Sequence, residues 1–225
     1  MPERISLSRD NVPFRWSADC GIPAMAELAG VRFDRMFLEV EAIVEAYTRG
    51  APLAAELFGP DVALAGPAWA GISYGHVNAL GCRLVFPEDS EVAHQPAFTS
   101  LEQAVEALQR NVDFAKAGMF PFYLDLWERL KRAFPDRRIP FSGYKAEGPL
   151  TTAWCLRGHG FFTDIYDNPL LAKEFLRLTT DSIIRYNRLI NRINGQPEVS
   201  PTGCGVADDV AAMIRPEMWP EFVMP

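Results

Sequence analysis

The sequence predicts an α/β protein built from repeated β/α units. Short apolar segments that suit strands alternate with segments in which apolar residues recur every three or four positions, as on the buried face of a helix. Four such units are present, which is half the number in an eight-fold barrel. A complete barrel typically needs about 250 residues or more. The chain has 225 residues, of which 48% are hydrophobic, so it can bury a sizeable core within one domain.

The first two units occupy the N-terminal part of the chain. Gly59-Pro60 separates the second unit from the first, because both residues interrupt helices. After the second strand, a helix-like stretch and the segment CRLVFPED at 82–89 interrupt the repeat as an insertion. The elements predicted here are strand 12–16, helices over 21–29 and 33–58, and strand 61–66.

A well-marked helix follows the insertion and precedes the third predicted strand. Ser100 and Gln103 form a capping box, and the residues on one face of the predicted helix are apolar, namely Leu101, Val105, Leu108 and Val112. A second helix at 120–134 leads to the third predicted strand, IPFSGYKAE at 139–147, which is rich in β-branched and aromatic residues.

Gly148-Pro149 ends this strand and starts another helix, since proline is tolerated in the first helical turn. Tyr144, Lys145 and Glu147 therefore lie near the carboxyl end of a strand. Barrels and open α/β sheets place their chemistry at that edge.

The clearest helix of the chain lies before the fourth predicted strand; it begins at Asn168-Pro169 and extends to Asn194. The segment EVSPTGCGVADD then predicts a strand at 200–206 that leads into Asp208-Asp209, and Pro216 begins one more helix. Because consecutive β/α units wind in one direction, the four strands should lie side by side, parallel and in chain order.

Charge and cysteine usage exclude several classes of protein. The formal net charge of −7 argues against a nucleic-acid partner, because no basic surface could offset phosphate repulsion. No apolar run reaches membrane-spanning length, and the N-terminus lacks the apolar core of a signal peptide. The cysteines form no C-x-x-C pair, which predicts reduced thiols in a cytoplasmic protein: Cys20, Cys82, Cys155 and Cys204.

Three segments carry a family resemblance, namely GPLTTAWCLRG at 148–158, LG-x-x-x-x-FPED at 80–89, and Asp208-Asp209 with the tail IRPEMWPEFVMP. They resemble the uroporphyrinogen decarboxylase superfamily, in particular its cobalamin-dependent methyltransferase branch. GPLTTAWCLRG at 148–158 is similar to the family segment G-P-F-T-x-A-x-x-L-x-G. Asp208-Asp209 with the tail IRPEMWPEFVMP is similar to D-D followed by I-S-P-E-x-F-x-E-F-x-x-P, with Arg215 in place of serine. LG-x-x-x-x-FPED at 80–89 adds to the likeness. The resemblance implies a (β/α)8 TIM barrel, of which residues 1–225 would be a single, C-terminally incomplete domain.

The resemblance also suggests cofactors and partners. Methyltransferases of this family hold zinc through a His-x-Cys motif and a later cysteine, and a corrinoid protein docks over the barrel mouth. His76, His94 and His159 are not spaced in this way from any cysteine, so we expect no cofactor within this chain. Zinc and a corrinoid are expected only in a full-length relative, with the zinc site beyond Pro225. The expected partners are a small-molecule substrate and a corrinoid protein.

The N-terminal segment separates the two branches of the family. Uroporphyrinogen decarboxylases share a P-x-W-x-M-R-Q-A-G-R segment whose arginines face the carboxylates of the tetrapyrrole. Ala18 and Ile22 occupy the corresponding positions here, and Asp19 would repel an anionic substrate. The sequence therefore favours the prediction of a methyltransferase-like protein that acts on a small methyl donor or acceptor. The alternative is a uroporphyrinogen decarboxylase, a lyase of porphyrin biosynthesis.

The predicted site residues combine carboxylates with aromatic side chains near the barrel mouth. The expected catalytic residues are Asp208, Asp209 and Glu147, and the expected substrate-binding residues are Asp19, Trp69 and Tyr144. Structural alternatives remain open, because aspartate pairs commonly cap turns and single aromatic residues are commonly core. A third possibility is a non-catalytic, incomplete barrel whose open strand edges associate with another chain.

Overall fold

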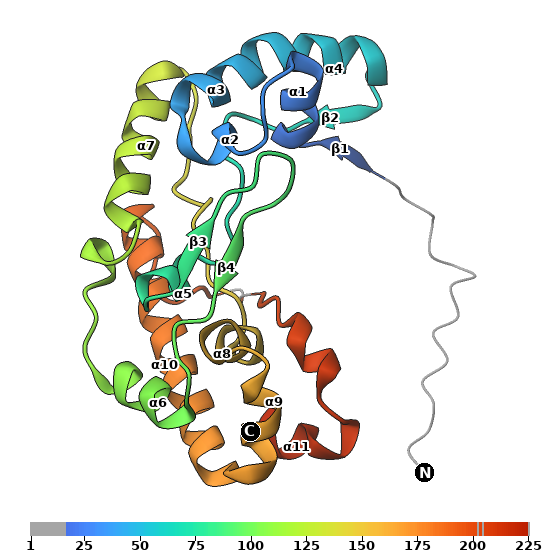
Figure 1. Cartoon of the computed structure of the whole chain (residues 1–225). Helices are drawn as coiled ribbons and strands as arrows, with labels where there is room; N and C mark the ends of the chain where they lie inside the picture. The colour runs from blue at the N-terminus through green and yellow to red at the C-terminus, as the bar shows by residue number, and fades with distance from the viewer. Residues whose placement is uncertain (1–16, 202, 204, 225) are drawn as a thin grey trace.

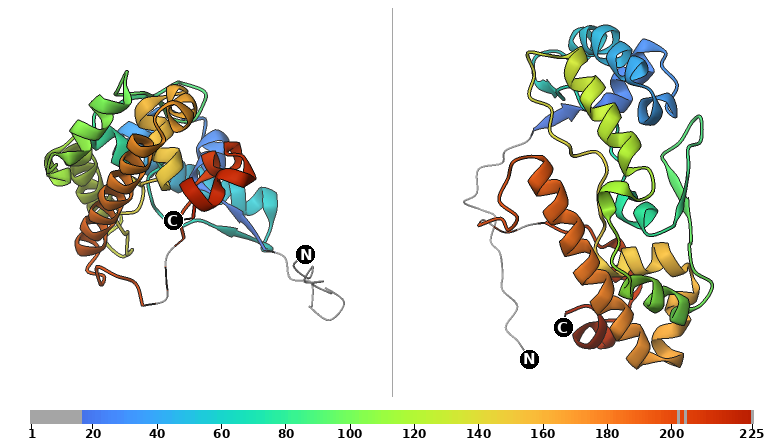
Figure 2. Two further views of the ribbon diagram at one scale, coloured as in Figure 1. Left: turned by 90° about the horizontal axis from the view of Figure 1, so that it is seen from below. Right: turned by 90° about the vertical axis from the view of Figure 1, so that its left-hand side faces the viewer.

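The computed structural model describes residues 17–201, 203 and 205–224. The chain is elongated, with α1 to α4 at one end and α8, α9 and α11 at the other (Figure 1). The helix α10 (Pro169–Ile193) runs lengthwise along one side, as two further views show (Figure 2). Helices account for most of the structure, and the sheets are small.

Two two-stranded sheets are present in the described residues. Strands β1 (Ala18–Cys20) and β2 (Val62–Leu64) pair in parallel, with Asp19 opposite Ala63. Strands β3 (Arg83–Val85) and β4 (Ala93–Gln95) form an antiparallel hairpin, which begins in the segment predicted as an insertion. The α/β class and the parallel pairing of the second predicted strand are confirmed.

The predicted four-stranded parallel sheet is wrong for the described residues. The first predicted strand, 12–16, lies outside the described part of the chain. The third, 139–147, contributes only an isolated parallel bridge between Ile72 and Tyr144. No strand occurs in the described residues of 200–206. Glycine and proline in both segments weaken strand formation.

A side chain takes the place of a neighbouring strand at Phe141. The amide of Asn194 accepts a hydrogen bond from the Phe141 N–H at 2.8 Å and donates one to the Phe141 carbonyl at 2.9 Å. Because both backbone groups of Phe141 are thereby satisfied, this segment needs no strand partner.

The N-terminal helices surround one hydrophobic cluster. The predicted helix 33–58 is interrupted, because Glu39 adopts an extended conformation and separates α2 from α3. Gly50 lies in a π-helical turn where an added Cβ would lie 2.0 Å from the Met25 carbonyl oxygen, so α1 packs directly on the backbone. The elements are α1 (Ile22–Ala29), α2 (Arg35–Leu38), α3 (Val40–Glu45), the π-helical turn Ala46–Gly50 and α4 (Ala51–Phe58).

The predicted starts of α6, α7, α8 and α10 are confirmed, whereas α9 was not predicted. The Ser100 side chain accepts a hydrogen bond from the Gln103 N–H at 3.3 Å, which confirms the predicted cap of α6. The Asn168 side chain caps α10 in the same way, through the Leu171 N–H. The other helices are α5 (Gly75–Ala79), α6 (Leu101–Gln109), α7 (Phe120–Ala133), α8 (Pro149–Arg157), α9 (Gly160–Asp167) and α11 (Trp219–Phe222).

The buried residues form two hydrophobic clusters. One includes α1 to α4 and α7, and the other includes α6, α8 and α9. The helix α10 joins them, because Phe175 belongs to the second cluster and Tyr186 to the first. Three of the four cysteines predicted to be reduced, Cys20, Cys82 and Cys155, are buried free thiols, and Cys204 lies outside the described residues. No helix in the described residues is both long enough and apolar enough to cross a membrane.

His76 is a buried polar residue between these clusters. Its Nε2 lies 2.8 Å from the Ser182 hydroxyl, its ring packs against Phe114 and Tyr186, and its Nδ1 has no hydrogen-bond partner among the described residues. Burial, with a smaller effect from the Arg185 charge, lowers the pKa of His76 to about 3. The folded protein therefore holds this imidazole neutral.

The stability of the protein should decrease in acid because of His76. Its unfolded pKa of about 6.5 exceeds the folded value, so below pH 6.5 the unfolded chain binds a proton that the folded chain does not. We expect this residue to lower the unfolding free energy by about 1.4 kcal/mol for each pH unit between about pH 6 and pH 4. Urea unfolding of His76→Gln should show a correspondingly shallower pH dependence. Parallel pH profiles for the two proteins would contradict this account.

Gly143 should not tolerate a side chain, because an added Cβ would lie 1.8 Å from the Trp69 Nε1 in the core. We expect Gly143→Ala to lower the unfolding free energy by about 1–3 kcal/mol through overpacking. Gly66→Ala is the matched control, since no heavy atom lies within 4 Å of its added Cβ. Denaturant unfolding of both variants tests the prediction, and equal stabilities would refute it.

Candidate functional site

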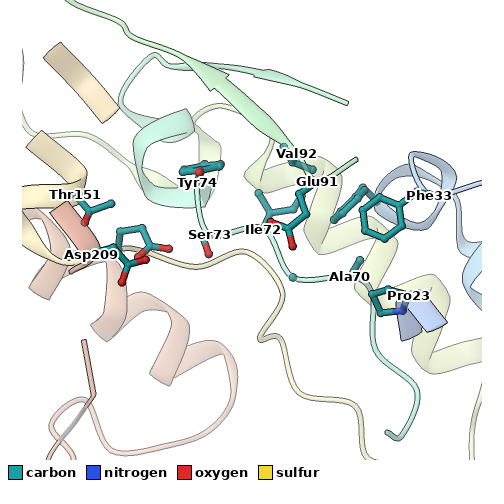
Figure 3. Close-up of a pocket in the computed structure, with 13 residues that line it drawn as sticks. Pro23, Phe33, Ala70, Ile72, Ser73, Tyr74, Glu91, Val92, Thr151 and Asp209 are labelled. Carbon is teal, nitrogen blue, oxygen red and sulfur yellow. The ribbon is translucent and has the colours of Figure 1, made fainter. Parts of the chain in front are cut away.

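A pocket of about 360 Å³ lies between the two hydrophobic clusters (Figure 3). Its walls come from the start of α1, the residues around α2, the segments 70–74 and 91–92, and the N-terminal end of α8 with its neighbouring tail. The lining residues are Pro23, Phe33, Phe37, Ala70, Gly71, Ile72, Ser73, Tyr74, Glu91, Val92, Glu147, Thr151 and Asp209.

Two of the predicted catalytic residues line this pocket. Glu147 precedes α8, and Asp209 begins a short 3-10 turn at Asp209–Met213. The structure adds a third carboxylate, Glu91, from the segment before β4. Figure 3 shows Asp209 beside Thr151 at one end of the pocket and Glu91 near Ile72. Glu91 was not predicted as a site residue, because the region after the second predicted strand was interpreted only as an insertion between β/α units.

Backbone hydrogen bonds position the Glu147 segment. The Ile72 N–H donates to the Gly143 carbonyl at 2.6 Å, and the Lys145 N–H donates to the Ile72 carbonyl at 2.8 Å. The His76 N–H then donates to the Lys145 carbonyl at 3.0 Å. These bonds hold residues 143–145 against the segment that forms the pocket floor, and they bring Glu147 to its edge.

Asp208 has a different environment from its neighbour. Its carboxylate accepts hydrogen bonds from the Leu150 N–H at 3.2 Å and the Thr151 N–H at 2.7 Å, which are free donors in the first turn of α8. It caps α8 from a distant part of the chain, and its negative charge interacts favourably with the positive end of the helix dipole. Asp208 is also absent from the lining of the pocket.

The tail and α8 make further contacts at this point. The Gly148 N–H donates to the Ala207 carbonyl at 2.7 Å, and the Val210 N–H donates to the Thr151 hydroxyl at 3.1 Å. An added Cβ at Gly148 would lie 2.5 Å from the Asp208 Cβ, so only glycine allows this approach. The order Gly148-Pro149 thus serves the docking of the tail as well as the start of the helix.

Tyr74 connects the pocket to an aromatic contact behind it. Its ring centroid lies 4.4 Å from that of His94, whose own ring packs on Trp154. Burial raises the pKa of the Tyr74 phenol, and negative charges nearby, including those of Glu147 and Asp209, raise it further. The phenol therefore remains protonated and can donate a hydrogen bond into the pocket.

The predicted substrate-binding residues lie elsewhere. Trp69 is 3% exposed and stacks on Tyr123 in the core. Tyr144 is 1% exposed, and its hydroxyl donates to the Asn78 side chain at 2.5 Å. Asp19 is exposed on β1 and lines a separate, shallower hollow of about 300 Å³. The structure does not bring these three residues to the pocket, and the aromatic residues there are Phe33, Phe37 and Tyr74 instead.

Zinc does not fit the described site. No group of three or more histidine, cysteine, aspartate or glutamate side chains within the described ranges is arranged to hold a metal ion. We therefore assign no chemical step to a metal held by these residues.

Asp208 and Asp209 should differ in their effect on stability. Asp208→Ala removes two hydrogen-bond acceptors from α8, and we expect the unfolding free energy to decrease by about 1–2 kcal/mol. Asp209→Ala removes an exposed carboxylate, for which a change within about 0.5 kcal/mol is expected. Urea unfolding of the two variants measures this difference directly. A larger loss in Asp209→Ala would contradict the assignment of the cap to Asp208.

Comparisons with known proteins bear on the fold and the family of the chain. The chain is similar in fold to a methyltransferase from Methanosarcina mazei, with a TM-score of 0.57 and 19% sequence identity. The match covers 94% of this chain and 60% of that structure, so the chain spans less than two thirds of its neighbour's length. No curated protein sequence matches. The family model for uroporphyrinogen decarboxylase (URO-D) matches residues 23–225. The chain therefore belongs to the uroporphyrinogen decarboxylase family.

Proposed function

We propose that this protein is a methyltransferase-like member of the family, which binds a small methyl donor or acceptor in the pocket of Glu147 and Asp209. The observation that carries the proposal is the acidic lining of that pocket, to which Glu91 contributes a third carboxylate. The similarity in fold to a methyltransferase supports the same branch.

The decarboxylase alternative requires a site for a substrate with many carboxylates. Like charges about 4 Å apart repel by about 1 kcal/mol in water and about 4 kcal/mol near a protein surface. Such a substrate would meet Glu91, Glu147 and Asp209, and none of the described residues that line the pocket is arginine or lysine. Ile22, where that branch has an arginine, is buried in the core.

The carboxylates would bind and orient the substrate. Glu147 lies at the edge of a segment fixed by backbone hydrogen bonds, and Asp209 begins a turn that is docked on α8. Their anchoring favours a defined orientation of the bound molecule, which is a major source of rate enhancement. Tyr74 supplies a protonated hydroxyl on the same wall.

A corrinoid protein is the proposed partner. A corrinoid, when bound at the mouth, would supply the methyl-carrying chemistry, and the residues described here would hold the small substrate facing it. The non-catalytic alternative has less support, because a docked turn, a capped helix and a fixed segment converge on one pocket.

Activity measurements should separate the two enzyme classes. We expect methyl transfer with a methylated substrate and a corrinoid, and no conversion of uroporphyrinogen to coproporphyrinogen. Glu147→Gln and Asp209→Asn should each lower kcat/KM for methyl transfer about 10- to 100-fold, which is about 1.4 to 2.7 kcal/mol of transition-state stabilisation. Glu56→Gln, an exposed position on α4, is the matched control and should retain full activity.

Decarboxylation at an enzymatic rate without methyl transfer would overturn the proposal in favour of the alternative branch. Unchanged methyl transfer in both pocket variants would remove Glu147 and Asp209 from the site.

A further inference from the structure

We infer that the ligand of this pocket is a small organic cation that carries methyl groups, such as a quaternary ammonium or a sulfonium compound. The inference rests on the proposed function, because it gives the substrate class of the same pocket. It is drawn from the combination of a concave site, aromatic residues in its lining, and carboxylates that form no ion pair with the described residues.

The carboxylates lack partners within the described structure. No ion pair or side-chain hydrogen bond to a described residue involves Glu91, Glu147 or Asp209. Acidic residues nearby are paired, since Glu88 lies 3.3 Å from Arg32 and Asp208 caps α8. The unpaired carboxylates come from three separate segments and share one pocket, so their negative potentials add there.

Three aromatic residues, Phe33, Phe37 and Tyr74, also line the pocket. Phe33 and Phe37 pack edge to face with ring centroids 5.3 Å apart, and Phe37 is buried. Figure 3 places Phe33 and Tyr74 toward opposite ends of the pocket, with Ile72 and Glu91 between them. Aromatic faces attract cations, and quaternary ammonium groups are commonly bound by rings with carboxylates nearby.

The rigidity of Tyr74 adds to this argument. His94 packs against its ring, and burial lowers the pKa of His94, which favours the neutral imidazole. The ring is therefore supported from behind by an uncharged group. A positive charge in the pocket would not be opposed by a cation at this contact.

Other ligand classes fit less well. Anions would be repelled by all three carboxylates, and a bare metal ion would require a convergent set of ligands that the described residues do not provide. A neutral ligand would cover the carboxylates without compensating their lost hydration. A methylated onium ion meets these conditions, because its charge is spread over a weakly hydrated, apolar surface.

Binding measurements with a charged and an uncharged ligand of the same shape test the inference. Choline and 3,3-dimethyl-1-butanol differ in that a carbon replaces the cationic nitrogen. Calorimetry on the full chain should show choline binding at least about 10-fold more tightly than the alcohol. Trimethylsulfonium should bind like choline, and added salt should weaken both cations.

Variants of the pocket separate the contributions to binding. Glu147→Gln and Asp209→Asn should each weaken choline binding about 3- to 10-fold, whereas Glu56→Gln should not change it. Tyr74→Leu should reduce the preference for choline over the alcohol, while Tyr74→Phe should retain it, because the ring face is the interacting group. Thermal unfolding of each variant confirms that the fold is retained.

The outcomes distinguish this inference from the proposed function. Equal affinity for choline and the alcohol, or no binding of any onium compound, would overturn the inference. If neutral methylated compounds were then turned over, the proposed function would stand without it. Charge-dependent binding of choline with no methyl transfer from any donor would establish the cation site and overturn the proposed function.

Discussion

The backbone contact between residues 72–76 and 143–145 determines the position of the candidate site. Its three hydrogen bonds join two segments that are far apart in the sequence. Side chains reinforce the contact, because Tyr144 bonds to Asn78 through its hydroxyl and accepts a hydrogen bond from Tyr186 at its carbonyl. One partner continues into the pocket floor, and the other continues into Glu147 and α8. The site therefore depends on a single irregular crossing rather than on a regular sheet edge.

The adjacent residues Asp208 and Asp209 show how one short turn serves both stability and binding. The Asp208 carboxylate accepts hydrogen bonds from two N–H groups at the start of α8, and this contact fixes the turn in which Asp209 lies. Asp209 is left free to face the pocket. A partly buried carboxylate that accepts hydrogen bonds from a helix start stabilises the fold, whereas an exposed and unpaired carboxylate adds little stability. Its position in the pocket lining is accounted for by the proposed binding of a substrate there.

Local sequence signals predicted the helices well and the site only in part. Asn168-Pro169 and Ser100 marked helix starts because a cap depends on residues close in sequence. The strand predicted at 139–147 is absent, and the N–H and carbonyl of Phe141 are satisfied by the side chain of Asn194 instead. No local sequence pattern indicates such a contact. Glu147 and Asp209 could be predicted from their places after strand-like segments and from the family resemblance. Glu91 and Tyr74 could not, since only the folded chain brings the hairpin and the segment before α5 to the same pocket.

The long helix α10 has a consequence for how the molecule moves. Its 25 residues extend about 37 Å at 1.5 Å per residue, and it contributes Phe175 to one hydrophobic cluster and Tyr186 to the other. A change in the distance between the two clusters would require α10, which contributes side chains to both, to bend or to slide. Both clusters resist such movement, since packed interiors have low compressibility. The mouth of the pocket should thus be held at a nearly constant width, and adaptation to ligands of different size would be left to the surrounding loops.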